Sequence, residues 1–151
     1  MKHPTFDAGC AVCRGNAGEA EVLFENELWL VRPGAGVPGW MTVQAQRHVP
    51  GIAYFNDVEV ANFGPAFRHF EKLLEDVTGA LRIYTCAMGE SSPHFHCHIV
   101  PRYEKMHDNA SGFDVFGLLR ASPERKAAEA AETERLKAAY KRALADSPPP
   151  L

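Results

Sequence analysis

The sequence HFHCHIVPR, from His94 to Arg102, carries the strongest structural signal in the chain. Histidines occupy every second position at its start, and successive side chains of a β-strand point to opposite faces of the sheet. We therefore expect a strand with His94, His96 and His98 on one face. The residues predicted to pack in the hydrophobic core on the other face are Phe95, Cys97 and Ile99.

Three imidazoles on one strand face favour chemistry over an ordinary polar surface. Each imidazole titrates near neutral pH, so together they can supply a nucleophile, a hydrogen-bond donor and a surface for an anion. Metal ligation is the alternative. The positions from His94 to His98 span about 13 Å of strand, however, so at most two of the three histidines can share one ion.

The segments around this strand predict an antiparallel sheet. Extended stretches at 22–31 and 40–43 are separated by a loop rich in proline and glycine, and residues 81–87 form a further strand that a turn joins to the histidine strand. Together these segments predict about five strands.

Two helices are predicted beside the sheet. Between Val60 and Val77 the apolar residues recur at steps of three and four, which is typical of a helix that packs on one face. Pro65 is expected to kink or restart this helix, and Gly79 to end it. The predicted fold class is α+β, an antiparallel sheet packed by one main helix, with a second helix near the carboxyl terminus.

The carboxy-terminal part of the chain differs in composition from the rest. We expect one domain over residues 1–120, a helical extension over 121–146 that begins after a Ser-Pro cap, and a disordered tail over 147–151. Only the second half of the extension carries an apolar stripe, which consists of Leu136, Ala139, Tyr140 and Leu144.

The overall composition excludes several classes of protein. Of 151 residues, 46% are hydrophobic and 23% charged, which suits a globular domain and neither a disordered chain nor a disulfide-stapled miniprotein. The net charge of -3 provides no global positive field for nucleic-acid polymers or anionic membranes. Because no apolar signal segment follows Met1 and Lys2, we expect a cytoplasmic protein.

Four cysteines divide into a close pair and two separate residues. Cys10-x-x-Cys13 suits either a zinc site or a thioredoxin-like redox pair, and the absence of a following βαβ pattern favours metal. Cys86 and Cys97 have apolar neighbours, so we expect both to be small buried hydrophobic residues.

The histidine motif resembles that of the histidine triad (HIT) family, in which His-x-His-x-His precedes two apolar residues and often Pro-Arg. A second similarity is the segment GWMTVQAQRH from Gly39 to His48, which resembles a glycine, an apolar strand and a terminal histidine of the family. The resemblance covers residues from about 10 to 105. It implies a HIT-like fold for the domain 1–120 and a homodimer.

The resemblance also implies an activity. Family members hydrolyse or transfer nucleotides joined through a phosphate, such as dinucleoside polyphosphates and nucleoside phosphoramidates, and the middle histidine forms a covalent nucleotidyl-histidine. By this resemblance His96 is the nucleophile and His98 lies beside the phosphate oxygens and the leaving group. Arg102 is either an anion contact or a solvated arginine at the strand end.

A structural zinc ion is implied in the same way. Some family members bind zinc through two amino-terminal cysteines, the histidine that closes the second motif, and the first histidine of the triad. The corresponding residues here are Cys10, Cys13, His48 and His94. Such a site would brace the strand that carries His96 and would leave the nucleophile free of metal.

One loop departs from the family pattern. Many members have a longer loop before the triad, with an asparagine followed by Gly-Gln. Here the loop at residues 88–93 is shorter and contains neither asparagine nor glutamine. Ser91 or Ser92 is expected to donate to the phosphate instead, and an ionised Glu90 would repel it. The alternative function is therefore a catalytically weak nucleotide-binding or zinc-stabilised interaction module. The residues considered for contact with the base are Phe24, Leu28 and Trp29, although the favoured interpretation of each one is an ordinary core residue.

Overall fold

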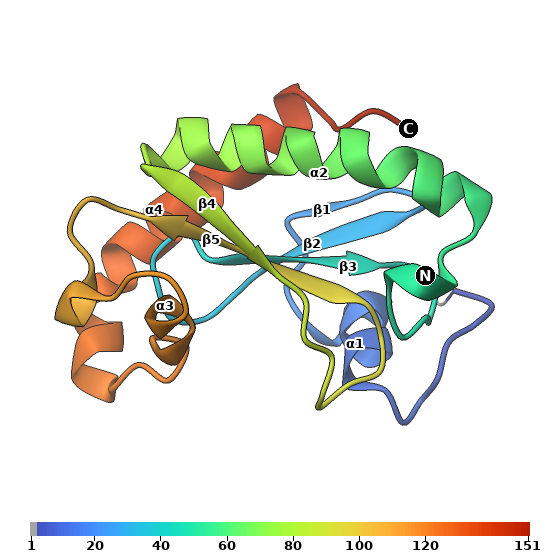
Figure 1. Ribbon diagram of the computed structural model, residues 1–151, viewed down its shortest axis with the longest axis horizontal. Helices are drawn as coiled ribbons and strands as arrows, with labels where there is room; N and C mark the ends of the chain where they lie inside the picture. Colours follow the sequence, from blue (N-terminus) through green and yellow to red (C-terminus); the bar gives the residue numbers. More distant parts are fainter. Residues whose placement is uncertain (1–2) are drawn as a thin grey trace.

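A five-stranded antiparallel sheet lies at the centre of the computed structural model, which describes residues 3–151 (Figure 1). Its strand order is β1-β2-β3-β5-β4. The strands are β1 (Phe24–Glu25), β2 (Trp29–Pro33), β3 (Met41–Ala45), β4 (Arg82–Cys86) and β5 (His96–Arg102). Residues 1 and 2 lie outside the described residues. They belong to the predicted domain 1–120, and they include the start of the segment in which no signal sequence is expected.

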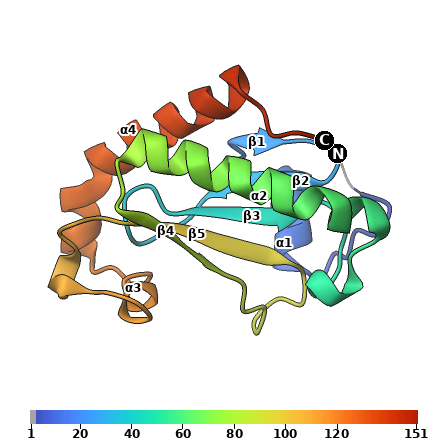
Figure 2. The ribbon, with the colours of Figure 1, turned by 45° about the horizontal axis from the view of Figure 1, so that its top comes forward.

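Helices cover the two faces of the sheet unequally. The long helix α2 (Asp57–Thr78) and the carboxy-terminal half of α4 (Pro123–Asp146) cover one face, while the short helices α1 (Ala11–Arg14) and α3 (Asp114–Gly117) lie on the other side (Figures 1 and 2). A π-helical turn at Gly15–Glu19 follows α1, and 3-10 turns occur at Ile52–Tyr54 and His107–Asn109. No helix within residues 3–151 has the length and apolar character needed to cross a membrane.

Local signals define both ends of α2. The Asn56 side chain accepts a hydrogen bond from the Glu59 backbone, and the Glu59 carboxylate accepts one from the Asn56 backbone, which forms a capping box. Gly79 ends the helix in the left-handed conformation, as predicted. The helix is continuous through Pro65, so the predicted restart is wrong, and Val60 is 58% exposed instead of facing the core.

The main hydrophobic core lies between α2 and the sheet. Phe95, Cys97 and Ile99 are buried there, as the alternating pattern of the histidine strand predicts. Buried partners from α2 include Phe67 and Phe70. The α2 face of the sheet is therefore the packing face, and the histidines of β5 lie on the opposite face.

The predicted extension over 121–146 is part of this core. Tyr140 and Leu144 are fully buried in it, and the Tyr140 hydroxyl donates to the Phe70 carbonyl at 3.0 Å. The following segment 147–151 lies against α2, where Asn62 Nδ2 donates to the Pro150 carbonyl at 2.8 Å. This placement differs from the disordered tail that the sequence predicts, because α2 supplies donors for its backbone carbonyls.

Candidate functional site

We call the sheet face opposite α2 the histidine face; it contains Arg32, Thr42, Gln44, His96 and His98. The register of the strands places these residues in two rows across the sheet. Thr42 of β3 pairs with both Arg32 of β2 and His98 of β5, and Gln44 pairs with His96. Since directly opposite residues of antiparallel strands point to the same side, all five side chains share this face.

His96 is held with one ring nitrogen available. Its Nδ1 lies 2.8 Å from the backbone carbonyl of His94, and because a carbonyl only accepts, Nδ1 donates in this contact. The neutral ring then carries its lone pair on Nε2. His96 is only half-buried, so a substrate can reach this ring. A neutral imidazole with an available lone pair can act as a nucleophile.

The indole of Trp40 sets the opposite tautomer in His98. Trp40 Nε1 donates to His98 Nδ1 at 3.1 Å, and an indole N–H cannot accept. The proton of neutral His98 therefore resides on Nε2. Burial, and then the neighbouring His96, lower the pKa of His98, which favours this neutral form. With ring centroids 5.6 Å apart, the two histidines present an acceptor nitrogen and a donor nitrogen.

A hollow of about 260 Å³ opens beside His96. The turn at Pro50–Gly51 forms one wall, and Met88 and Gly89 of the loop before β5 form another. The loop that was predicted to contact the phosphate is therefore brought to the nucleophile. Met88 and Gly89 of this loop line the hollow, whereas Ser91 and Ser92 do not.

The other predicted residues of this region lie farther from the hollow. Ser91 and Glu90 are exposed and Ser92 is half-buried in the loop before β5. Arg102 is on the same side of β5 as His98, but four strand residues, about 13 Å, separate their Cα atoms. The Arg102 guanidinium donates to the Tyr103 carbonyl at 2.7 Å, and the structure does not bring it to His96.

A separate cluster of sulfur and nitrogen atoms lies at the start of the histidine strand. The ligand atoms of Cys10, Cys13, His48 and His94 all lie within 4.8 Å of one another. Cys13 Sγ is 3.2 Å from His48 Nδ1 and 3.3 Å from His94 Nδ1, and Cys10 Sγ is 3.7 Å from His94 Nδ1. The four residues whose side chains the family resemblance assigns to zinc are brought together.

The geometry of this cluster fits a tetrahedral zinc ion. Bond lengths of about 2.0 to 2.3 Å place neighbouring ligand atoms about 3.3 to 3.8 Å apart, close to the separations found here. His94 Nε2 lies 2.7 Å from the Ala45 carbonyl, which holds Nδ1 toward the sulfur atoms. Burial raises the pKa of the Cys13 thiol, so a cation at this position is needed to favour its thiolate.

The structure also places the cysteines and the residues considered for the base. Cys10 caps α1 and Cys13 lies within it. The expectation that Cys86 is buried is wrong. Cys86 is half-buried and pairs directly with His98 on the histidine face. Phe24, Leu28 and Trp29 pack in or against the core on the α2 face, which confirms the interpretation of each as an ordinary core residue over a contact with the base.

Trp40 is a residue of this site that sequence reasoning missed. It precedes β3 and has the same parity as Thr42 and Gln44, so alternation along the strand places its side chain on their side. Its ring is only 2% exposed and packs edge-on against His98 and Phe116. The signal was present in the sequence, but the contact with His98 joins residues 58 positions apart.

Known structures resemble this arrangement over nearly the whole chain. A hypothetical histidine triad nucleotide-binding protein from Sulfolobus tokodaii is 16% identical, with a TM-score of 0.65 over 91% of this chain and 93% of that one. A histidine triad protein from Bradyrhizobium japonicum is 18% identical, with a TM-score of 0.65 over 92% and 98%. The chain has the histidine triad fold.

A zinc-bound member of the histidine triad family is among these structures. This protein from Mycobacterium smegmatis is 18% identical, with a TM-score of 0.62 over 91% of this chain and 97% of that one. No family model and no curated protein matches the sequence. The likeness is therefore one of histidine triad fold, and the chemistry has to be argued from the site.

Proposed function

We propose that this histidine triad protein is a nucleotide hydrolase or nucleotidyl transferase. Its substrates are nucleotides joined through the α-phosphate, such as dinucleoside polyphosphates and nucleoside phosphoramidates. The observation that carries the proposal is the pair of fixed tautomers, with His96 Nε2 free to attack and His98 Nε2–H free to donate. The hollow beside His96 supplies space for a substrate.

The chemistry follows from these two nitrogens. His96 Nε2 attacks the α-phosphorus, the bond from phosphorus to the leaving group breaks, and the leaving group departs with its electron pair. His98 Nε2–H donates to a phosphate oxygen on which negative charge develops. Water or another hydroxyl then attacks the phosphorus and gives up its proton to solvent, the P–N bond breaks, and the electrons of that bond return to His96 Nε2. A polyphosphate leaving group needs no proton, whereas an amine must gain one from solvent or substrate.

We propose that Cys10, Cys13, His48 and His94 hold a structural zinc ion. The ion would bind two thiolates and two imidazoles and would fix the start of β5 against α1. His96 lies two residues after His94 and donates to its carbonyl, so the metal site would hold the backbone that positions the nucleophile.

The proposal also includes contacts outside the two histidines. Ser91 and Ser92 are retained as donors to the phosphate because their loop borders the hollow beside His96. Arg102 remains a predicted anion contact, and the homodimer remains a prediction of the family resemblance. The loop contains no amide donor, and the loss of one oxyanion donor typically lowers turnover by about 10² to 10³.

The test is mass spectrometry after brief mixing with dinucleoside polyphosphates and nucleoside phosphoramidates. Wild type is expected to form product and an adduct of one nucleotidyl group, and His96→Ala is expected to lose both by about 10³-fold or more. His107→Ala is the matched control, because His107 is an exposed histidine outside the histidine face. Its adduct and product should equal those of wild type.

Two other results would change the conclusion. An adduct that persists in His96→Ala would refute the assignment of the nucleophile. Nucleotide binding without any product or adduct would refute the enzyme and support the nucleotide-binding module instead.

A further inference from the structure

Arg32 is a half-buried cation on the histidine face without a protein partner. Its guanidinium forms no hydrogen bond and no ion pair with any of residues 3–151. Burial lowers its pKa, which reflects the cost of holding this charge away from water. A guanidinium has five N–H donors, so an unpaired one in this position is a binding group that awaits an acceptor.

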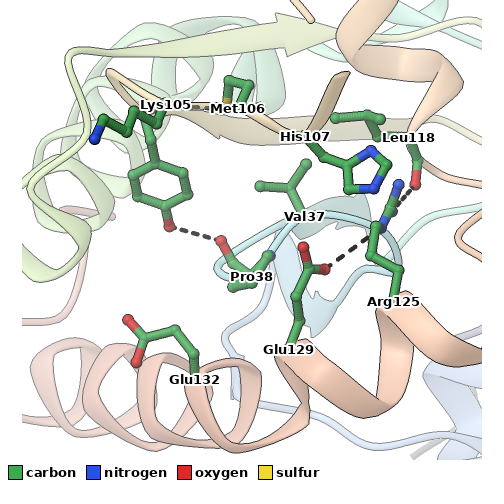
Figure 3. A pocket seen from close by; sticks show the side chains of 10 residues that line it. Val37, Pro38, Lys105, Met106, His107, Leu118, Arg125, Glu129 and Glu132 are labelled. Carbon is green, nitrogen blue, oxygen red and sulfur yellow. Dashed lines mark hydrogen bonds and ion pairs between the residues drawn. The ribbon is translucent and has the colours of Figure 1, made fainter. Parts of the chain in front are cut away.

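Two other partly buried arginines of this chain are paired. Arg47 forms two hydrogen bonds to the Glu59 carboxylate, at 2.6 and 2.9 Å. Arg125 donates to the Leu118 carbonyl and lies 3.5 Å from Glu129, in a pocket beside the start of α4 (Figure 3). The chain thus supplies acceptors to these two, and Arg32 is left open on the same face as the nucleophile.

The position of the Arg32 guanidinium is set by a glycine. A Cβ atom on Gly15 would overlap Arg32 Nη1, so the side chain lies in space that only glycine leaves free. Gly15 begins the turn after α1, two residues beyond the proposed zinc ligand Cys13. The side chain therefore extends from β2 toward the metal cluster, alongside the row that contains Gln44 and His96.

We propose that Arg32 binds a second anionic group of the nucleotide substrate, separate from the phosphate that His96 attacks. The inference rests on the proposed function and assigns a substrate class to the same site, namely nucleotides that carry a second phosphate. This phosphate is either attached to the ribose or part of a polyphosphate chain. Two phosphate oxygens match the planar fork of a guanidinium.

The surface between Arg32 and the histidines is suited to the body of such a nucleotide. Thr42 lies between Arg32 and His98 in the same row, so two strand spacings, about 10 Å, separate the outer Cα atoms. Gln44 Oε1 is buried there without a hydrogen-bond partner among residues 3–151. This oxygen would accept a bond from a substrate hydroxyl or amine.

The experiment measures binding to purified protein of known zinc content by calorimetry. The probes are adenosine 5′-monophosphate, the 2′,5′- and 3′,5′-bisphosphates, and the 5′-diphosphate. Wild type is expected to bind at least one two-phosphate probe about tenfold or more tightly than the monophosphate, since a charge-assisted pair is stronger than a neutral hydrogen bond. The preferred probe tells whether the second phosphate lies on the ribose or in the chain.

Arg32→Gln is expected to abolish this preference and to leave monophosphate affinity within about threefold of wild type. Arg68→Gln is the matched control, because Arg68 is an exposed arginine of α2, on the other side of the sheet, and should keep the preference. Gly15→Ala leaves the charge in place but displaces it, so it should reduce the preference too while zinc content stays unchanged.

Equal affinity of wild type for all four probes would overturn the role of Arg32, as would a uniform loss of affinity in Arg32→Gln. The covalent adduct at His96 would still stand in both cases. No binding of any nucleotide to the zinc-loaded wild type would instead overturn the proposed function together with this inference.

Discussion

The two faces of the sheet are built from the same strands but differ in how their side chains are packed and paired. On the α2 face, aromatic rings pack edge to face around Trp29, and its indole N–H is paired with Asn62 at 2.7 Å. On the histidine face, the polar side chains of Thr42 and Gln44 are buried, while among residues 3–151 Arg32 has no hydrogen-bond or ion-pair partner and Gln44 is incompletely paired. The first face is packed with apolar side chains, and hydrogen bonding is incomplete on the second.

Because of this difference, alternate residues of a single strand serve stability on one face and chemistry on the other. In β5, Cys97 and Ile99 are buried in the core, and His96 and His98 alternate with them on the other face. A rigid strand therefore presents both histidines from a fixed backbone, which limits the freedom lost when a substrate binds. Substitutions on the two faces should consequently have different effects.

The largest effect on stability is expected from the α2 face. Phe70 is fully buried, so Phe70→Ala should lower the free energy of unfolding by about 3 to 5 kcal/mol. Its counterpart His96→Ala should cost about 1 kcal/mol, the loss of one hydrogen bond, although it abolishes adduct formation. Urea denaturation of both variants checks the contrast. Equal losses of stability would contradict the division between the faces.

Removal of a metal ion from the cluster of Cys10, Cys13, His48 and His94 should have the next largest effect. At free zinc about 100 times the Kd, chelation should remove about 2.7 kcal/mol of stability. Denaturation with and without a chelator, alongside metal analysis, measures this. Cys13→Ser should bind zinc weakly, so chelation should lower its free energy of unfolding only slightly. If wild type retains its full stability after chelation, no structural metal occupies the cluster.

The smallest effect is expected from Trp40→Phe, which keeps an aromatic ring but removes the donor to His98. The indole bond stabilises neutral His98, so its removal should raise the pKa of His98. Turnover should fall about threefold to tenfold. Nitrogen NMR of the imidazoles reports both the pKa and the tautomer. Unchanged His98 signals in a destabilised variant would show that Trp40 only packs.

Much of the site was predictable because it depends on local pattern. Alternation along residues 94–102 predicts both faces of β5, and Gly79 marks the end of α2 in a way that needs no distant contact. The metal residues were predicted from the family resemblance, and the structure brings all four together. The start of α2 was predicted less well, because a capping box at Asn56 extends it beyond its first apolar residue.

The chain alone specifies which residue types are available and how they alternate, since both follow from covalent order and from the geometry of strands and helices. It specifies neither the tautomers of His96 and His98 nor the open guanidinium of Arg32. Those depend on the His94 carbonyl just before β5, an indole before β3 and a missing Cβ after α1. The first contact is local, but it needs the backbone bend before β5. The other two join distant positions, and they arise only when the strands are set in register and α1 is packed against them.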